Sequence, residues 1–198
     1  KSKDIDAKKT YANIMNYFVI AVSVMFLGVL LYLEVFKLLL LNNEEYWVGL
    51  KVVPILLMAN VCLGIYYNQS LWYKLSGQTK YGAYFAIGGA VLTLVLNRIF
   101  IPSLGYVASA WATLMVYASM MVASYYYGQK HYPIPYNLRK TGFYLAFALV
   151  LYGLSALFKS FLPESLGVLL SFNTLLFALY LWFIYKLEGI NLKGILKK

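Results

Sequence analysis

The chain has 198 residues, of which 62% are hydrophobic and only 12% are charged. A soluble domain is roughly half apolar and about a quarter charged, so this composition excludes a soluble globular protein and indicates a chain that lies in a lipid bilayer. The net charge of +10 does not indicate nucleic-acid binding, because the basic residues alternate with apolar runs instead of forming one continuous face. The single cysteine, Cys62, and the single histidine, His131, exclude a disulfide framework and a zinc cluster, and we expect neither a metal nor a cofactor.

Apolar runs long enough to cross a membrane recur six times along the chain. A helix needs roughly 20 residues to cross about 30 Å of hydrocarbon. The runs lie at about residues 11–33, 48–72, 81–101, 106–127, 138–158 and 166–185. The sequence therefore predicts an all-α integral membrane protein in which residues 1–198 form one six-helix bundle.

The first span follows a polar, basic lead-in over residues 1–10 and carries polar interruptions such as Asn16 and Ser23. These side chains could face a solvent-filled cavity or bond to neighbouring helices, and the sequence favours neither. After the span, Glu44 and Glu45 are adjacent. Because neighbouring positions on a helix point in different directions and no partner base is visible, we interpret this pair as part of a solvated loop.

The second span contains Pro54, which removes a backbone donor and predicts a kink near the start of the helix. Backbone groups that lose their helical hydrogen bonds at a kink need partners in protein or water. The side of the span that carries Pro54 is therefore expected to face a cavity or another helix. Polar residues on the same span are Lys51, Asn60, Asn68 and Gln69. Asn60 and Asn68, eight residues apart, lie near one face of a helix.

The third span ends with an amide and a charge, Asn97 and Arg98. A charged residue inside a membrane span is costly, by roughly 2.5 to 3.5 kcal/mol at the centre, and usually functional. Arg98 is near enough to the end of the span to extend its guanidinium into the headgroup layer, or it could face an anionic substrate group. Gly82, Ala86 and Ala90 recur at four-residue spacing, which indicates close packing of helices.

A turn of only a few residues, carrying Pro102 and Gly105, joins the third span to the fourth. In the fourth span small residues again recur at helical spacing and predict packing positions: Ala108, Ala112, Ser119 and Ala123. Two prolines then predict an extended connector over residues 128–140. Within this connector we expect His131 to be an interfacial loop residue.

Basic residues concentrate on one side of the predicted membrane. Counting Lys and Arg between successive spans gives 13 on the side of the two termini and 4 on the other side. Because basic loops remain in the cytoplasm, both termini are predicted to be cytoplasmic. A unit with both ends on one side can repeat without inversion, as in transporters built from two parallel halves that meet at a central substrate path.

The segment around the short turn resembles a known sequence pattern. Residues 97–102 (NRIFIP) and 105–113 (GYVASAWAT) resemble the N-x-x-L-I-P-x-x-G-x-x-G-A-A-x-A-T segment in the C-terminal half of polysaccharide biosynthesis proteins, with Ser109 as a mild departure from a small residue. Residues 68–80 (NQSLWYKLSGQTK) and 126–136 (YYGQKHYPIPY) are similar to the versions in Bacteroidetes-type members. These proteins are the oligosaccharidyl-lipid flippases of the multidrug/oligosaccharidyl-lipid/polysaccharide exporter superfamily.

The resemblance, which covers most of residues 1–140, implies a function and a setting. Members of this family flip a polyprenyl-pyrophosphate-linked oligosaccharide across the bacterial inner membrane by alternating access, for assembly of cell-surface polysaccharide or lipopolysaccharide. The chain would then be the C-terminal six-helix lobe of a longer, two-lobed transporter. Its expected partners are the lipid-linked oligosaccharide, membrane lipid and the missing N-terminal lobe of the same chain, with no nucleic acid.

Such a substrate needs cations for its pyrophosphate and hydrogen-bonding groups for its sugars. The candidates by residue chemistry are Arg98 and Lys51 for the phosphates, and Asn60, Asn68, Gln69 and Asn97 for the hydroxyls. No catalytic residue is expected, because the nucleophile and metal-ligand spacings of a membrane enzyme are not seen. Two related functions stay open: an ion-coupled multidrug exporter, which needs a carboxylate inside the membrane, and a flippase for a peptidoglycan lipid precursor.

Overall fold

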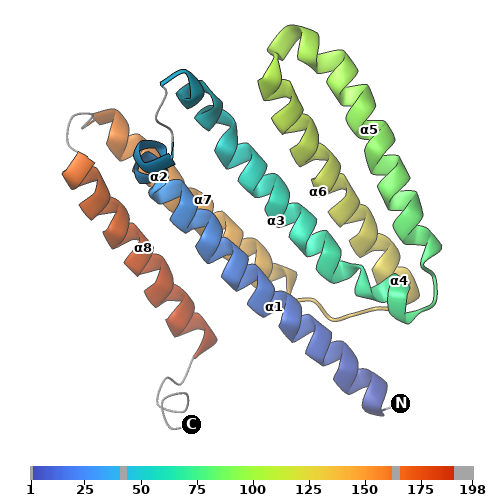
Figure 1. Cartoon of the computed structure of the whole chain (residues 1–198). Helices are drawn as coiled ribbons and strands as arrows, with labels where there is room; N and C mark the ends of the chain where they lie inside the picture. The colour runs from blue at the N-terminus through green and yellow to red at the C-terminus, as the bar shows by residue number, and fades with distance from the viewer. Residues whose placement is uncertain (1, 41–43, 162–165, 190–198) are drawn as a thin grey trace. The chain divides into compact units, whose positions relative to one another are not determined.

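The computed structural model describes residues 2–40, 44–161 and 166–189, and all regular structure within them is helical (Figure 1). The elements are α1 (Ser2–Leu31), α2 (Leu33–Leu40), η1 (Glu44–Val52), α3 (Val53–Gln69), α4 (Leu71–Leu75), α5 (Lys80–Leu104), α6 (Tyr106–His131), α7 (Leu138–Phe161) and α8 (Leu166–Glu188). The element η1 is a 3₁₀ helix, and the others are α-helices. Among the described residues, six helical segments are long and apolar enough to cross a membrane. The predicted all-helical class is confirmed, and the chain fits a multi-pass membrane protein.

The membrane-length segments contain the predicted spans almost completely. They run Asp6–Leu31, Trp47–Leu75, Lys80–Leu104, Tyr106–His131, Leu138–Phe161 and Leu166–Glu188. Most extend the predicted span by a few residues, because helical hydrogen bonding continues into polar turns that hydropathy does not count. The polar lead-in is one such extension, since α1 already begins at Ser2.

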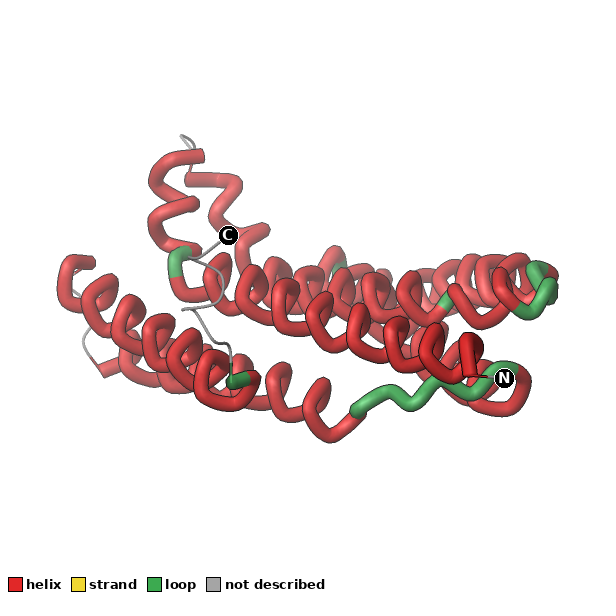
Figure 2. The backbone as a smooth tube through the Cα atoms, turned by 90° about the horizontal axis from the view of Figure 1, so that it is seen from below, coloured by secondary structure: helices red, strands yellow, loops and turns green. Residues whose placement is uncertain are grey.

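The chain divides into two compact units, which are described separately. Unit 1 comprises residues 1–19 and 41–138, and unit 2 comprises residues 20–40 and 139–198. The helix α1 therefore contributes its first part to unit 1 and its last part to unit 2. Short loops join the helices, and the longest described one is residues 132–137 (Figure 2).

In unit 1, α6 packs against both α3 and α5 and lies between them (Figure 1). Most of its buried residues follow a four-residue repeat: Ala108, Ala112, Val116, Ser124 and Gly128. The predicted packing positions Ala108 and Ala112 are therefore confirmed. Ser119 is exposed and Ala123 is only half-buried, because these two residues lie to one side of the buried stripe.

Two prolines occupy positions that differ from the prediction. The helix α5 continues through Pro102 to Leu104, so Gly105 alone forms the turn to α6. Pro102 has no N–H and leaves the carbonyl of Arg98 without its usual helical donor, yet the helix continues two residues past it. Gly105 has a φ of 60°, which glycine adopts without the steric penalty of a side chain. Pro54 lies in the first turn of α3, where a donor is not needed, and it marks the change from η1 to α3 instead of a kink.

In unit 2, α7 and α8 meet through side chains. The rings of Phe158 and Phe172 stack with their centroids 4.1 Å apart. The buried stripes are Tyr144, Ala148, Leu151 and Ser155 on α7 and Leu169, Asn173, Leu176, Tyr180 and Ile184 on α8. The helical path breaks at Tyr32, between α1 and α2, where the Val35 N–H donates to the Tyr32 carbonyl at 3.0 Å.

Candidate functional site

The six residues predicted to bind substrate all lie in unit 1, on η1, α3 and α5. Lys51, Asn60 and Arg98 are exposed, Asn68 and Asn97 are half-buried, and Gln69 is buried. Two of the amides bond to their own helix: Asn60 Nδ2 donates to the Leu56 carbonyl at 2.8 Å, and Asn68 Nδ2 donates to the Gly64 carbonyl at 3.4 Å. The oxygen of each of these two amides remains available as an acceptor.

A hollow of about 350 Å³ lies between α3, α5 and α6 in unit 1. Tyr66 and Tyr67 line it from α3, and Tyr117 lines it from α6. On α5 its lining includes the small residues Ala86 and Ala90. These two alanines are exposed, so they border open space where the sequence predicted close helix packing.

None of the six predicted residues lines the hollow, but two of them continue the helix faces that form it. Asn60 precedes Tyr67 by seven residues, and Asn97 follows Thr93, which lines the hollow, by four. These spacings place side chains on one face of a helix. The Oδ1 atom of Asn97 is buried and has no hydrogen-bond partner among the described residues. A buried polar atom normally has a partner, so this oxygen marks a place where a water or a ligand would bind.

The other four predicted residues lie elsewhere on unit 1. Arg98 follows Val91 by seven residues and Leu94 by four, and it shares their exposed, apolar face of α5. A rotation of about 100° around the helix separates Arg98 from Asn97. Gln69 lies on the buried side of α3, and Lys51 is exposed in the last turn of η1. None of the six predicted residues lines the hollow itself; Asn60 and Asn97 continue the helix faces that form it, whereas Arg98 lies on another face of α5.

The sequence pattern does not identify the tyrosines that line the hollow. Tyr66 is only 4% exposed, and its ring meets Phe85 edge-on with the centroids 6.2 Å apart. Tyrosines in a membrane protein are usually assigned to the headgroup layer. Tyr66, Tyr67 and Tyr117, however, lie well inside their membrane-length segments. Their distance from the ends of those segments is the signal that distinguishes them.

An aromatic cluster forms where α5 begins and α6 ends. His131 lies in the last turn of α6, not in the predicted loop, and stacks on Trp72 with ring centroids 5.6 Å apart. Trp72 is 1% exposed, and its Nε1–H donates to Ser124 Oγ at 3.2 Å. Tyr81 and Tyr127 contact the same His131 ring. Since these side chains come from α4, α5 and α6, the cluster holds the three helices together.

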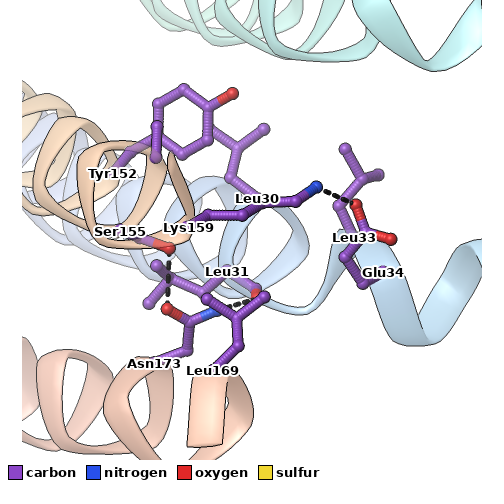
Figure 3. A pocket seen from close by; sticks show the side chains of 10 residues that line it. Leu30, Leu31, Leu33, Glu34, Tyr152, Ser155, Lys159, Leu169 and Asn173 are labelled. Carbon is purple, nitrogen blue, oxygen red and sulfur yellow. Dashed lines mark hydrogen bonds and ion pairs between the residues drawn. The ribbon is translucent and has the colours of Figure 1, made fainter. Parts of the chain in front are cut away.

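Unit 2 contains a smaller hollow of about 210 Å³ beside the break between α1 and α2 (Figure 3). Ser155 Oγ donates to Asn173 Oδ1 at 2.7 Å, and Asn173 Nδ2 donates to the Leu31 carbonyl at 2.6 Å. Lys159 forms an ion pair with Glu34 across the same hollow (Figure 3). None of these residues was predicted to be functional. Asn173 could have been singled out as an amide within an apolar span, which usually has a partner on another helix.

The carboxylate of Glu34 lies just outside the Asp6–Leu31 segment. Partial burial by itself raises the pKa of Glu34, but the hydrogen bond and charge of Lys159, together with Lys37, outweigh burial and leave the pKa below its ordinary value. Glu34 is therefore ionised at neutral pH. Its carboxylate forms ion pairs with Lys159 and Lys37.

Within the described ranges, no three side chains of His, Cys, Asp or Glu gather closely enough to hold a metal ion. Cys62 is a buried, free cysteine on α3. It behaves as a small apolar residue of the helix interface.

Comparison with known proteins does not assign the chain to a family. No family model, no curated protein and no solved structure matches it. A function for this chain therefore has to be inferred from the resemblance of its short segments, from the six membrane-length helices and from the chemistry of the hollows.

Proposed function

We propose that this chain flips a polyprenyl-pyrophosphate-linked oligosaccharide from the cytoplasmic to the outer leaflet of a bacterial inner membrane, for assembly of surface polysaccharide or lipopolysaccharide. In this proposal the six membrane-length helices form one lobe of a two-lobed transporter that works by alternating access. Both ends of the lobe lie in the cytoplasm, and an N-terminal lobe completes the substrate path. The resemblance of residues 97–113 to the flippase pattern supplies the substrate class.

The observation that carries the proposal is the hollow of about 350 Å³ in unit 1. A flippase has to offer hydrogen bonds to a sugar headgroup within a surface that is otherwise apolar. Asn60 and Asn97 supply amide groups one helical turn beyond the lining residues Leu63 and Thr93, and the Asn97 oxygen lacks a partner among the described residues. Tyr67 and Tyr117 supply faces that combine an apolar ring with a hydroxyl. This set suits a ligand with alternating hydroxyl and C–H surfaces.

The pyrophosphate requires positive charge, which the hollow itself does not contain. In our proposal Arg98 and Lys51, both exposed on unit 1, meet the pyrophosphate on the surface that borders the second lobe. A guanidinium forms two parallel hydrogen bonds with a phosphate, so Arg98 is the stronger candidate. Asn97, assigned to the sugar, and Arg98, assigned to the phosphate, then lie on different faces of α5.

The proposal is tested by complementation. The complete reading frame that encodes this sequence is expressed in a bacterium that lacks its oligosaccharide flippase, and surface glycan and accumulated lipid-linked intermediate are measured together. We expect restored glycan and a cleared intermediate. Replacing both Asn60 and Asn97 by Leu should prevent the rescue while the protein remains in the membrane. Asn68→Leu is the matched control, because Asn68 is another amide of α3 with the same kind of bond to its own helix as Asn60; in this proposal it does not contact the sugar, so its loss should be tolerated.

The outcomes of this experiment separate the related functions. Rescue that persists in the double variant would remove the hollow from the substrate path. No rescue by membrane-inserted protein, combined with rescue of a strain that lacks its peptidoglycan-precursor flippase, would assign the other lipid substrate. Resistance to cationic drugs without clearance of either lipid intermediate would overturn the flippase proposal in favour of an exporter.

A further inference from the structure

A third hollow, of about 240 Å³, lies in unit 2 where α7 begins and α8 ends. Arg139, Lys140, Phe143, Tyr144 and Leu187 line it. The first two residues belong to the first turn of α7, at the end of a membrane-length segment. The hollow therefore lies at the level where a helix leaves the hydrocarbon and meets the headgroup layer.

The positive charges of this hollow are not equivalent. Glu188 accepts hydrogen bonds from Lys140 Nζ at 2.9 Å and from the Tyr144 hydroxyl. Glu188 therefore offsets the charge of Lys140 and fixes the Lys140 and Tyr144 side chains. Arg139 is exposed, and no carboxylate of the described chain pairs with it. The hollow consequently presents one guanidinium without a carboxylate partner among the described residues, beside a hydrogen-bonded wall.

The remaining wall is apolar and faces outwards. Phe143 and Leu187 are 47% and 45% exposed, and the Phe143 ring stacks on Phe183 of α8 at a centroid distance of 5.2 Å. Val150 and Leu154 continue the exposed face of α7 at spacings of seven and eleven residues from Phe143. An apolar track thus leads from the charged hollow along α7 into the hydrocarbon.

We propose that this hollow binds an anionic phospholipid, with the phosphate on Arg139 and an acyl chain against Phe143 and Leu187. A phosphodiester complements the uncompensated guanidinium, which can hold two of its oxygens at once. The apolar track covers an acyl chain, which a soluble phosphate lacks. Basic pockets between helices at the membrane surface bind anionic headgroups by the same combination. The site lies in unit 2 and does not depend on the flippase proposal.

Native mass spectrometry of the full chain tests this site. The protein is reconstituted with phosphatidylglycerol and phosphatidylcholine of identical acyl chains and released from lipid in stages. We expect retention of phosphatidylglycerol in preference to phosphatidylcholine, and a loss of about fivefold or more in that retention for Arg139→Gln. Arg139→Lys should retain an intermediate amount, because the charge remains but the paired geometry is lost. The matched control is Lys130→Gln, which removes another exposed cation at the end of a helix.

Three results would overturn the proposal. The first is equal retention of phosphatidylglycerol by Arg139→Gln and the original chain. The second is an equal loss in Lys130→Gln, which would mean that general surface charge holds the lipid. The third is displacement of the lipid by soluble glycerol phosphate at millimolar concentration, which would indicate a phosphate site without a role for the acyl chain. Because Arg139 is exposed, its variants should keep their helical circular dichroism and thermal stability.

Discussion

Asn173 joins three helices through one buried side chain. Its amide donates to the Leu31 carbonyl at the end of α1 and accepts from Ser155 of α7. In a continuous helix the Leu31 carbonyl would accept from Val35, but the Val35 N–H donates to Tyr32 at the break. Asn173 therefore supplies the donor that the break removes. In hydrocarbon an unsatisfied carbonyl is costly, which explains an asparagine in this apolar span.

Replacing Asn173 by Leu should destabilise unit 2 by about 1 to 2 kcal/mol, because the Leu31 carbonyl and the Ser155 hydroxyl both lose a partner. Thermal unfolding in micelles, followed by circular dichroism, measures the change. Ser171→Ala is the control on the same helix, since Ser171 is exposed and its hydroxyl donates to the Gly167 carbonyl of its own helix. Equal melting temperatures for the Asn173 variant and the original chain would contradict the proposed role.

The Glu34–Lys159 ion pair should make the thermal stability of the chain decrease at acidic pH. The pKa of Glu34 is lower in the folded chain than its ordinary value of 4.5. A lowered pKa means that the ionised form favours folding, so this contribution is complete above the ordinary value and disappears as the pH falls through the folded value. We expect the melting temperature to fall in this acidic window. In Glu34→Gln the melting temperature should fall less over the same pH range, because no carboxylate is protonated at this position. The same pH dependence of the melting temperature in both proteins would contradict the stabilising role of the ionised Glu34.

At the residue scale, the sequence identifies polar and charged side chains within apolar spans. It does not predict which of them lie close together in the fold. Asn60 and Asn97 were chosen as polar residues in apolar spans, and both continue helix faces that form one hollow, although neither lines it. Arg98 and Gln69 were chosen for the same reason, yet they lie on other faces of their helices. Helical spacing relates residues within one helix, whereas the side on which a neighbouring helix packs depends on the tertiary fold.

At the scale of the element, the close approach between α4 and α6 depends on one glycine. A Cβ atom added to Gly128 would lie 2.9 Å from Cδ1 of Trp72, whose side chain is 1% exposed. Trp72 cannot move easily, because its Nε1–H bonds to Ser124 and its ring stacks on His131. Because Gly128 has no side chain, the indole of Trp72 on α4 can pack against α6 at this position.

Gly128→Ala should destabilise unit 1 by about 1 to 3 kcal/mol through this overlap. Gly142→Ala, on α7, is the control, because a Cβ there meets no atom within 4 Å. Alanine favours a helix over glycine by about 1 kcal/mol, so the control should be neutral or slightly more stable. Tryptophan fluorescence during thermal unfolding reports both changes, and a neutral Gly128→Ala would show that the indole has room to shift.

The helical elements were predictable because each has to satisfy its own backbone within the bilayer, so length and hydropathy are sufficient. Their ends were less predictable. Pro102 suggests a turn in sequence, but α5 continues past it and ends at Leu104, before Gly105. His131 lies in the last turn of α6, where its ring stacks on Trp72, a residue 59 positions away in the chain. Local sequence cannot specify such a contact.

At the scale of the whole molecule, the asymmetric distribution of basic residues predicts which loops lie in the cytoplasm. A single cysteine introduced at Gln78, between α4 and α5, should react with a membrane-impermeant thiol reagent only from the cytoplasmic side. One introduced at Ser103, near the other end of α5, should react only from the opposite side. The background is Cys62→Ala, which removes the buried native thiol. Labelling of both sites from the same side would contradict the six-crossing topology.

The one-residue turn at Gly105 also constrains how the protein is made. Only 6% of the most apolar stretch of α5 is buried, against 22–39% for the other five segments, and its main packing partner is α6. When α5 crosses the bilayer, the chain has to re-enter it directly after Gly105. The turn leaves no loop in which the residues of α6 could remain outside the bilayer before they insert. We therefore expect the insertion machinery to receive the two helices as a single hairpin, and a ribosome that stalls before α6 is complete would leave α5 without its packing partner.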